Sequence, residues 1–388
     1  MAEFEPRRAF EHIDKLAYEI GPRLAGTSGD RMAAEYIKKQ FESYGLRPRV
    51  QEFKFVNRSA RLKTTSLLFV TAFVALLFLP PELSFLTWIA AVITWRSLEK
   101  IMPKHTSQNI IAVRKVEKPR KRVAVTAHYD SAPCTASHKL HIFLKLTFVP
   151  FLLLISIILV LHALRFVPAW SVVWAVLAFT FLPVCTGVFI MGQDRIISPG
   201  ANDNASGVAV MLEAARVLAE SPPADTELRF IAFGAEEQAL VGARKLVKEK
   251  FLPPDTLVVN LDMVGTGGQA YIIEGNGIFR RTKTSARVNR ALSNSIQRSE
   301  LKARFLWAAL AKHDHIPIVR AEIQATTFSI DTPAVDRLSR RIAKLFGLPN
   351  AKVCGYRYIH TSDDTPDRLE LTNIERAGSV VLDFIKTV

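Results

Sequence analysis

The chain has 388 residues, with 51 Lys and Arg against 36 Asp and Glu, and its formal net charge is +15. The basic residues are spread along the polar segments without a zinc finger, an aromatic RNA-binding signature or a compact basic helix, which argues against a nucleic-acid partner. Three cysteines lie far apart, which argues against a disulfide framework and favours a reducing compartment.

The N-terminal region predicts two helices and a strand. Its first 20 residues lack the apolar core of a cleavable signal peptide. Residues 7–20 and 29–44 have helical periodicity, and the second helix is expected to begin at Thr27 and to stop at Gly45. Residues 50–56 alternate as a half-buried strand does.

Two long blocks are almost free of charge. Residues 64–95 contain only Glu82, and residues 146–191 contain only Arg165. The uncharged runs of the second block are long enough to cross a hydrocarbon core of roughly 30 Å, so a transmembrane helical hairpin is expected there. In the first block the arm 83–95 is short for a crossing, so this hairpin is expected to tilt, thin the bilayer or re-enter without spanning. A hairpin buried in a soluble core is the alternative.

Both blocks interrupt one set of strands, so each must return the chain to the side that it left. Lys and Arg gather on the flanks of the blocks, and the positive-inside rule therefore places the rest of the chain in the cytoplasm. We expect residues 1–63, 96–145 and 192–388 to form one catalytic domain.

Strands alternate with helices outside the blocks. Strands are predicted over 109–113, 122–126, 228–233 and 256–261, and helices over 205–220 and 237–250. This alternation is typical of an α/β fold with a mostly parallel central sheet and helices on both faces. Ligands of such sheets gather at the carboxyl ends of the strands.

The C-terminal third is less regular. Residues 264–335 are rich in glycine, and only helices near 284–297 and over 332–346 are predicted beside the final helix. That last helix is expected to begin at Thr372, with Glu375 completing a capping box.

Five fragments, TAHYDS, GANDNASG, FGAEEQ, NLDMVG and YIHTSDDTPDRL, place acids and imidazoles at strand ends or turns. A pair of zinc ions needs a bridging carboxylate, imidazoles, terminal carboxylates and one further acid that moves protons. The fragments supply that set, and the adjacent Glu236 and Glu237 point different ways at a strand end, so that one can bind metal while the other serves as base.

These fragments, together with IGPRLAGTSGDRMAAEYIKKQFESYGL near the N-terminus, resemble the M28 family of zinc peptidases. The resemblance covers the chain except for the two uncharged blocks and part of 266–310. It implies the phosphorylase/hydrolase-like fold of zinc exopeptidases and Zn²⁺ as cofactor, with two ions per chain.

The family pattern also implies a role for each site residue. Glu236 is implied to be the general base that moves a proton from a metal-activated bridging water to the leaving amine, and Asp130 to orient an imidazole ligand. The implied metal ligands are Asp203 as the bridge, His128 and Asp262 on one zinc, and Glu237 and His360 on the other.

The chain departs from the family pattern at 312–315, Lys-His-Asp-His, where the family carries Ser-Asp-His. We interpret Asp314 and His315 as pocket or structural residues rather than as a third metal site. Tyr356 and Tyr358 are candidates for binding the oxyanion, with a packing role as the alternative.

A further departure is the long connection between His128 and Asp203, most of which is the second uncharged block. Because both ends carry ligands of the same zinc, we expect the cleft to open close to the bilayer. A membrane-associated peptide, such as a signal-peptide remnant, is the expected substrate.

The sequence therefore predicts a multi-pass, membrane-anchored dizinc metallopeptidase, an aminopeptidase in type, with its catalytic domain on the cytoplasmic side. Its partners are a peptide substrate and the lipid bilayer. The alternatives are a glutaminyl-peptide cyclotransferase-like enzyme with a single zinc and a non-enzymatic membrane-assembly relative.

Overall fold

The computed structural model describes residues 3–76, 79–134, 138–164, 166, 172–191, 196–278, 280–309, 311–332 and 356–388. Contacts divide the chain into two compact units. The sheet unit comprises residues 1–54, 106–134 and 196–388, and the helical unit comprises residues 55–105 and 135–195.

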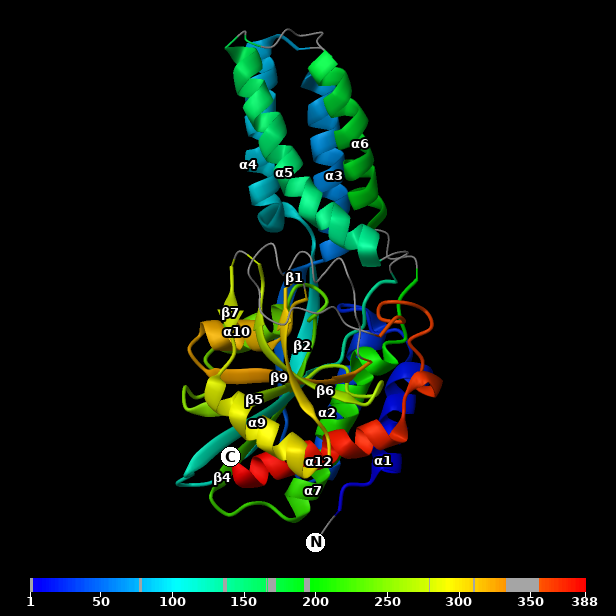
Figure 1. Cartoon of the computed structure of the whole chain (residues 1–388), viewed down its shortest axis with the longest axis vertical. Helices are drawn as coiled ribbons and strands as arrows, with labels where there is room; N and C mark the ends of the chain where they lie inside the picture. Colours follow the sequence, from blue (N-terminus) through cyan, green and yellow to red (C-terminus); the bar gives the residue numbers. More distant parts are fainter. Residues whose placement is uncertain are drawn as a thin grey trace. The chain divides into compact units, whose positions relative to one another are not determined.

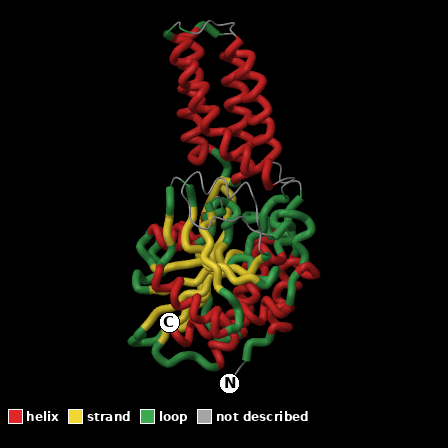
Figure 2. Tube along the Cα trace, viewed as in Figure 1, coloured by secondary structure: helices red, strands yellow, loops and turns green. Residues whose placement is uncertain are grey.

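The strands lie at the centre of the sheet unit, with helices beside them (Figures 1 and 2). They are β1 (Arg49–Val56), β2 (Lys104–Arg114), β3 (Lys121–His128), β4 (Thr226–Phe233), β5 (Thr256–Leu261), β6 (Gln269–Asn276), β7 (Thr282–Lys283), β8 (Ala303–Ala308) and β9 (Gln324–Asp331). The helices are α1 (Pro6–Asp14), η1 (Lys15–Ile20), α2 (Ser28–Ser43), η2 (Ala201–Ala205), α7 (Ser206–Glu220), α8 (Val241–Lys248), α9 (Ala286–Arg298), α10 (His315–Arg320), η3 (Pro366–Arg368) and α12 (Leu371–Thr387).

The strands form one mixed sheet in the order β1-β2-β4-β3-β5-β9-β6-β7, with β8 paired to β6. Its centre is parallel, because β4, β3, β5 and β9 run in the same direction, whereas β2 and β6 are antiparallel to their neighbours β4 and β9. The strands β3 and β5 are almost wholly buried, as strands covered on both faces must be. The predicted α/β fold is confirmed, and the sheet, which was predicted to be mostly parallel, is mixed with a parallel centre.

Alternate residues of the central strands enter two different hydrophobic cores. In β3, Val123 and Val125 pack in a core with side chains of α1, α2, α7, α9 and α12. Ala124, which lies between them, packs in a second core with Ala243 and Leu246 of α8 and with residues near α10. Helices therefore cover both faces of the sheet, and the sheet edge at the strand ends is left for the site.

Several helices begin at other residues than the sequence predicted. The helix predicted from residue 237 starts only at Val241, because Ala239 and Leu240 adopt positive φ angles of 72° and 62° that an α-helix excludes. The predicted capping box at Thr372 is wrong: the helix begins one residue earlier, at Leu371, and among the described residues no side chain caps its first turn. The predicted helix over 332–346 lies almost wholly outside the described residues.

The helical unit contains α3 (Arg58–Leu76), α4 (Pro81–Ile101), α5 (His138–Ala163) and α6 (Val172–Met191). Helix α3 packs on α4 and α6, and α5 packs on the same two helices. Aromatic pairs pack in its interior: the ring centroids of Phe69 and Trp88 lie 5.3 Å apart, as do those of Phe73 and Phe181.

The two expected hairpins are present as helices, but their crossing of a membrane is not supported. None of the helices in the described part of the chain is both long enough and apolar enough to span a bilayer. In the first hairpin the charged flanks belong to the helices themselves, since α3 starts at Arg58 and α4 continues past Arg96 to Ile101, so each uncharged run is only part of its helix.

Candidate metal centre

Three of the predicted fragments lie where neighbouring parallel strands end. His128 is the last residue of β3, Asp262 directly follows β5, and Glu236 and Glu237 lie in the turn that follows β4. Because β4, β3 and β5 are adjacent and parallel, their carboxyl ends meet at one edge of the sheet. The sheet thus brings an imidazole and three carboxyl groups to a single place.

The other two fragments reach the same place from loops. Asp203 lies in η2, immediately before α7. His360 has a positive φ of 55° and lies in a turn in which the Thr361 N–H donates to the Tyr358 carbonyl at 3.1 Å. Both segments lie far from β5 in the sequence, so only the fold brings the set together.

The five predicted ligands form two sets that share one residue. We call His128, Asp203 and Asp262 the inner set and Asp203, Glu237 and His360 the outer set; within each, one ligand atom per residue lies within 4.8 Å of the others. Asp203 faces both imidazoles, with Oδ1 3.2 Å from His128 Nε2 and Oδ2 3.1 Å from His360 Nε2. His360 Nε2 also lies 2.9 Å from Glu237 Oε1.

The electrostatics of these sets favour positive charge. Burial lowers the pKa of His128, but the carboxylates of Asp130, Asp203 and Asp262 outweigh that effect and hold this pKa well above its ordinary value. Burial raises the pKa of Asp203, but the imidazoles of His128 and His360 outweigh this effect, so that the pKa is lowered. Charge and donor chemistry both suit a divalent cation, and imidazole nitrogen with carboxylate oxygen is a set that zinc accepts.

Asp130 supports the centre in a way that the sequence did not suggest. Its carboxylate accepts hydrogen bonds from the main-chain N–H groups of Glu236, at 2.9 Å, and Glu237, at 3.1 Å. His128 Nδ1 lies 3.2 Å from the main-chain carbonyl oxygen of Asp130 and 3.7 Å from its carboxylate. Asp130 therefore holds the loop of Glu236 and Glu237 while its carbonyl contacts the His128 ring.

Asp364 fixes the loop of Asp203 by accepting main-chain N–H groups, as Asp130 does for the loop of Glu236 and Glu237. Its carboxylate accepts the N–H groups of Asn202, at 2.8 Å, and Asp203, at 3.1 Å, and the Tyr356 hydroxyl donates to it at 2.9 Å. Burial raises the pKa of Asp364 to about 6. Sequence reasoning missed this residue, and the only available signal was its place in the HTSDDTPDRL fragment.

The two tyrosines have partners that suit support rather than oxyanion binding. The Tyr356 hydroxyl is engaged with Asp364, and its side chain is buried. The Tyr358 ring lies under two guanidinium groups, with Arg357 Cζ 4.8 Å and Arg368 Cζ 4.9 Å from the ring centroid. Both contacts favour the packing alternative.

The polar residues of GANDNASG join the loop of Asp203 to the loop that follows β5. Asn204 Oδ1 accepts the N–H of Met263 at 3.1 Å, and Asn204 Nδ2 donates to the Leu261 carbonyl at 2.8 Å. Ser206 Oγ accepts the Val264 N–H at 3.1 Å. These bonds fix the chain on both sides of Asp262 relative to Asp203, which makes the shape of the inner set part of the fold.

Arg23 ties the N-terminal segment to the same region. Its side chain is completely buried, and such a charge requires full hydrogen bonding. Its guanidinium donates to the main-chain carbonyl groups of Leu16, Gly21, Tyr129, Pro199 and Gly200. The residue after His128 and the residues just before η2 are thereby held by one side chain.

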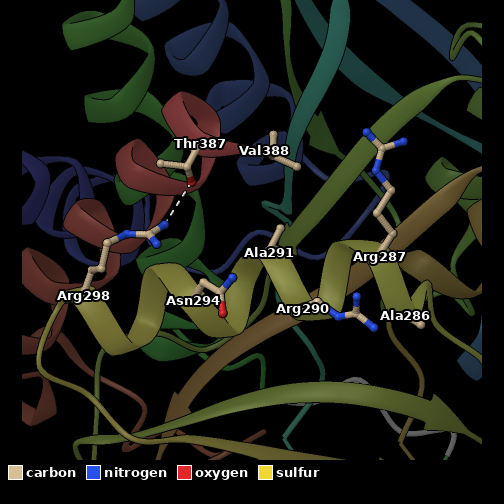
Figure 3. A pocket seen from close by; sticks show the side chains of 8 residues that line it. All are labelled: Ala286, Arg287, Arg290, Ala291, Asn294, Arg298, Thr387 and Val388. Atoms are coloured by element: carbon tan, nitrogen blue, oxygen red, sulfur yellow. Dashed lines mark hydrogen bonds between the residues drawn. The ribbon is translucent and has the colours of Figure 1, made fainter.

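A separate pocket of about 450 Å³ lies along helix α9 and the end of the chain (Figure 3). Its lining includes Arg287, Arg290 and Arg298 of α9 together with Thr387. Arg298 Nη2 donates to Thr387 Oγ1 at 3.0 Å, and the same guanidinium pairs with Asp383. These bonds tie α9 to α12, so we regard this pocket as a surface feature of that contact.

The fold and the two candidate ligand sets together suit a zinc-dependent peptidase. The chain belongs to peptidase family M28, whose family model matches residues 184–385. It is 32% identical over 195 residues to aminopeptidase YwaD of Bacillus subtilis, a match that covers 47% of this chain and 36% of that protein. The chain thus spans about a third of the length of this relative.

Solved structures share the fold. The crystal structure of BSAP, a zinc aminopeptidase from Bacillus subtilis, has a TM-score of 0.60 at 20% identity, covering 99% of this chain and 95% of that one. A glutaminyl cyclase from Bacteroides thetaiotaomicron bound to N-acetylhistamine has a TM-score of 0.61 at 16% identity, covering 100% and 98%. One fold therefore serves both a peptidase and a cyclase, and the site must distinguish them.

Proposed function

We propose that this chain is a dizinc aminopeptidase that hydrolyses the N-terminal peptide bond of a peptide substrate. The observation that carries the proposal is the shared Asp203, whose two carboxylate oxygens face one imidazole each at 3.2 and 3.1 Å. Such a carboxylate can serve two ions at once, and each ion then has one imidazole and one further carboxylate of its own.

Zinc bound at such a centre supplies Lewis acidity, which acidifies water and polarises the scissile carbonyl. Glu236 is free of the two ligand sets and is the general base, taking a proton from the attacking water and returning it to the leaving amine. Its main-chain N–H is held by Asp130 at 2.9 Å, which limits the positions that its carboxylate can take. The same clamp holds the adjacent Glu237, so base and ligand keep a fixed relation.

The alternative is a glutaminyl-peptide cyclotransferase with a single working zinc. Such an enzyme shares the fold, but the complete inner set of His128, Asp203 and Asp262 beside the outer set favours two ions. Zinc stoichiometry separates the alternatives: two equivalents per chain support the peptidase, and a single equivalent in the active protein supports the cyclase.

The decisive experiment measures release of nitroaniline from aminoacyl-nitroanilides. We expect the zinc-loaded protein to be active and the Glu236→Gln variant to lose about 100- to 10,000-fold in kcat. Both proteins should hold the same amount of zinc. Glu249→Gln, a change at an exposed acid next to α8, is the matched control and should leave kcat unchanged. Unchanged activity of Glu236→Gln would refute the assigned base.

We propose further that the helical unit contacts lipid and holds the protein on the cytoplasmic side of a membrane. Large apolar side chains point outward from its helices: Leu67, Ile93 and Leu153 are each about 60% exposed. Exposed apolar surface of this kind marks an interaction site. The chain should float with phospholipid vesicles on a density gradient, and a variant with Ile93→Asn and Ile157→Asn should float less. Equal sedimentation with and without vesicles would contradict the proposal.

A further inference from the structure

His313 lies against the ligand Asp262, opposite the metal-binding side. Its Nδ1 is 2.7 Å from Asp262 Oδ2, and both side chains are buried. A carboxylate accepts hydrogen bonds only, so Nδ1 must carry the hydrogen and donate it. A hydrogen bond to a charged group is the stronger kind, and here it occupies one of the two oxygens of a candidate metal ligand.

The His313 ring is itself fixed by its surroundings. It stacks on the His315 ring, with centroids 5.8 Å apart and planes 22° from parallel. His315 Nδ1 lies 2.6 Å from Thr327 Oγ1 of β9, and this hydroxyl also accepts from Asn260 Nδ2 of β5 at 3.2 Å. The donor is therefore connected by stacking and hydrogen bonds to the two strands beside the inner set.

The other oxygen of Asp262 faces the inner set. Asp262 Oδ1 lies 3.9 Å from His128 Nε2, and the same nitrogen is 3.2 Å from Asp203 Oδ1. Since Oδ2 accepts from His313 and Oδ1 is the oxygen near His128, Oδ1 is the oxygen best placed for an ion between these groups. A carboxylate without this bond can rotate or bind an ion through both oxygens, which moves the ion relative to the bridging Asp203.

We propose that His313 is a positioning residue that restricts Asp262 to one metal-binding oxygen and so sets the place of the ion in the inner set. The inference rests on the metal centre of the proposed function. From the sequence, the Lys-His-Asp-His segment was interpreted as part of the pocket or of the packing. The proposal adds that its first histidine positions a candidate metal ligand. Partners of ligands typically change metal affinity by about 10- to 100-fold.

The test compares His313→Ala, which removes the donor, with His313→Asn, which keeps an N–H donor near the position of Nδ1. The control is His12→Ala, because His12 is also buried and also hydrogen-bonded, to the Tyr36 hydroxyl at 2.6 Å, but belongs to α1. Zinc affinity of each metal-free full-length variant is measured by competition with a chromogenic chelator. The visible absorption spectrum of the Co²⁺-loaded protein reports the geometry of the ion.

We expect His313→Ala to weaken the binding of one zinc by about 10- to 100-fold and to change the Co²⁺ spectrum. His313→Asn and His12→Ala should stay within a few-fold of the original affinity. If His313→Ala binds both ions as the original chain does and leaves the spectrum unchanged, the inference is refuted while the metal centre stands. If the original chain binds no zinc, the proposed function fails instead. Circular dichroism of each variant shows whether a weakened affinity reflects unfolding, and a loss equal in His12→Ala would also refute the inference.

Discussion

The inner and outer sets of the metal centre share Asp203 but are enclosed differently. The two other ligands of the inner set are almost fully buried, with His128 2% and Asp262 7% exposed. In the outer set Glu237 is 8% exposed, but His360 is 23% exposed. His128 and Asp262 lie at the ends of β3 and β5, whereas Glu237 lies in the turn that follows β4 and His360 in a turn far in the sequence from any described strand.

This difference indicates that one half of the centre is formed by the sheet and the other half is completed by loops. Strand ends in a parallel sheet have little freedom, and Asp262 is additionally held by His313. The outer half depends on Asp130, which clamps the glutamate loop, and on the turn at His360. We therefore expect the inner half to bind its ion more tightly and the outer half to release its ion to solvent more readily.

The largest effect is expected from Asp203→Asn, because this change affects both halves. An amide offers a single acceptor oxygen and no negative charge, so at most one ion keeps an oxygen ligand from this residue and neither keeps the charge of the carboxylate. We expect kcat/KM for an aminoacyl-nitroanilide to fall by at least about 1000-fold, with loss of zinc measured by elemental analysis. Retention of two tightly bound ions would show that the halves do not depend on a shared carboxylate.

Removal of metal should release the two ions at different rates. Chelation of the zinc-loaded protein is expected to proceed in two phases, a fast one from the more exposed outer half and a slow one from the inner half. In His360→Ala the fast phase should disappear, and in His128→Ala the slow phase should disappear, each with a drop of about 100-fold or more in activity. A single phase in the original protein, or the reverse assignment, would mean that burial does not set the order of release.

The two carboxylates that clamp main-chain N–H groups allow a matched comparison. Asp130→Asn and Asp364→Asn each replace one of two accepting oxygens by an N–H₂ group, which opposes a donor. Asp130 holds both the base Glu236 and the ligand Glu237, so we expect about a 100-fold loss in kcat there. Asp364 holds only the loop of Asp203, and about 10-fold is expected. Equal losses would show that clamping the base adds nothing.

The smallest effect is expected from Tyr356→Phe. It removes the hydrogen bond to Asp364 but leaves both main-chain N–H donors in place. The free energy of unfolding should fall by about 1 kcal/mol, as measured by urea denaturation, and kcat should stay within about threefold. A loss of kcat near 100-fold with unchanged stability would restore Tyr356 as an oxyanion ligand.

The candidate ligands could be selected from the sequence because each lies at the end of a strand or in a turn with a distinctive local sequence. The supporting residues were not, because their roles depend on pairs that only the fold creates. Six of the described strands lie between Asn202 and Asp364 in the sequence, and three lie between Asp262 and His313. Nothing in the local sequence of either residue indicates these contacts.

The fold was predictable where periodicity was strong. Three of the four central parallel strands, β3, β4 and β5, and helix α7 were predicted within a few residues, since their apolar residues are continuous or helically spaced. Strands β6 to β9 were missed, because glycines and short polar runs obscure the alternation between residues 264 and 335. Helix α8 starts late because the ligand loop needs positive φ angles that sequence patterns do not record.

Pro133 pairs with Ile197, so the chain enters and leaves the second helical insertion at neighbouring positions. An insertion of this kind can be replaced without moving the strands around it. Residues 132–134 and 196–198 run antiparallel. The Cys134 N–H donates to the Ile196 carbonyl at 2.8 Å, and the Ser198 N–H donates to the Ala132 carbonyl at 2.9 Å. Paired residues of this kind have Cα atoms about 5 Å apart, a gap that a tight turn closes. The first insertion likewise leaves and returns through adjacent strands, β1 and β2. A shortened enzyme with two turns in place of the helices is thus within reach of protein engineering, and the same junctions would accept a different insert.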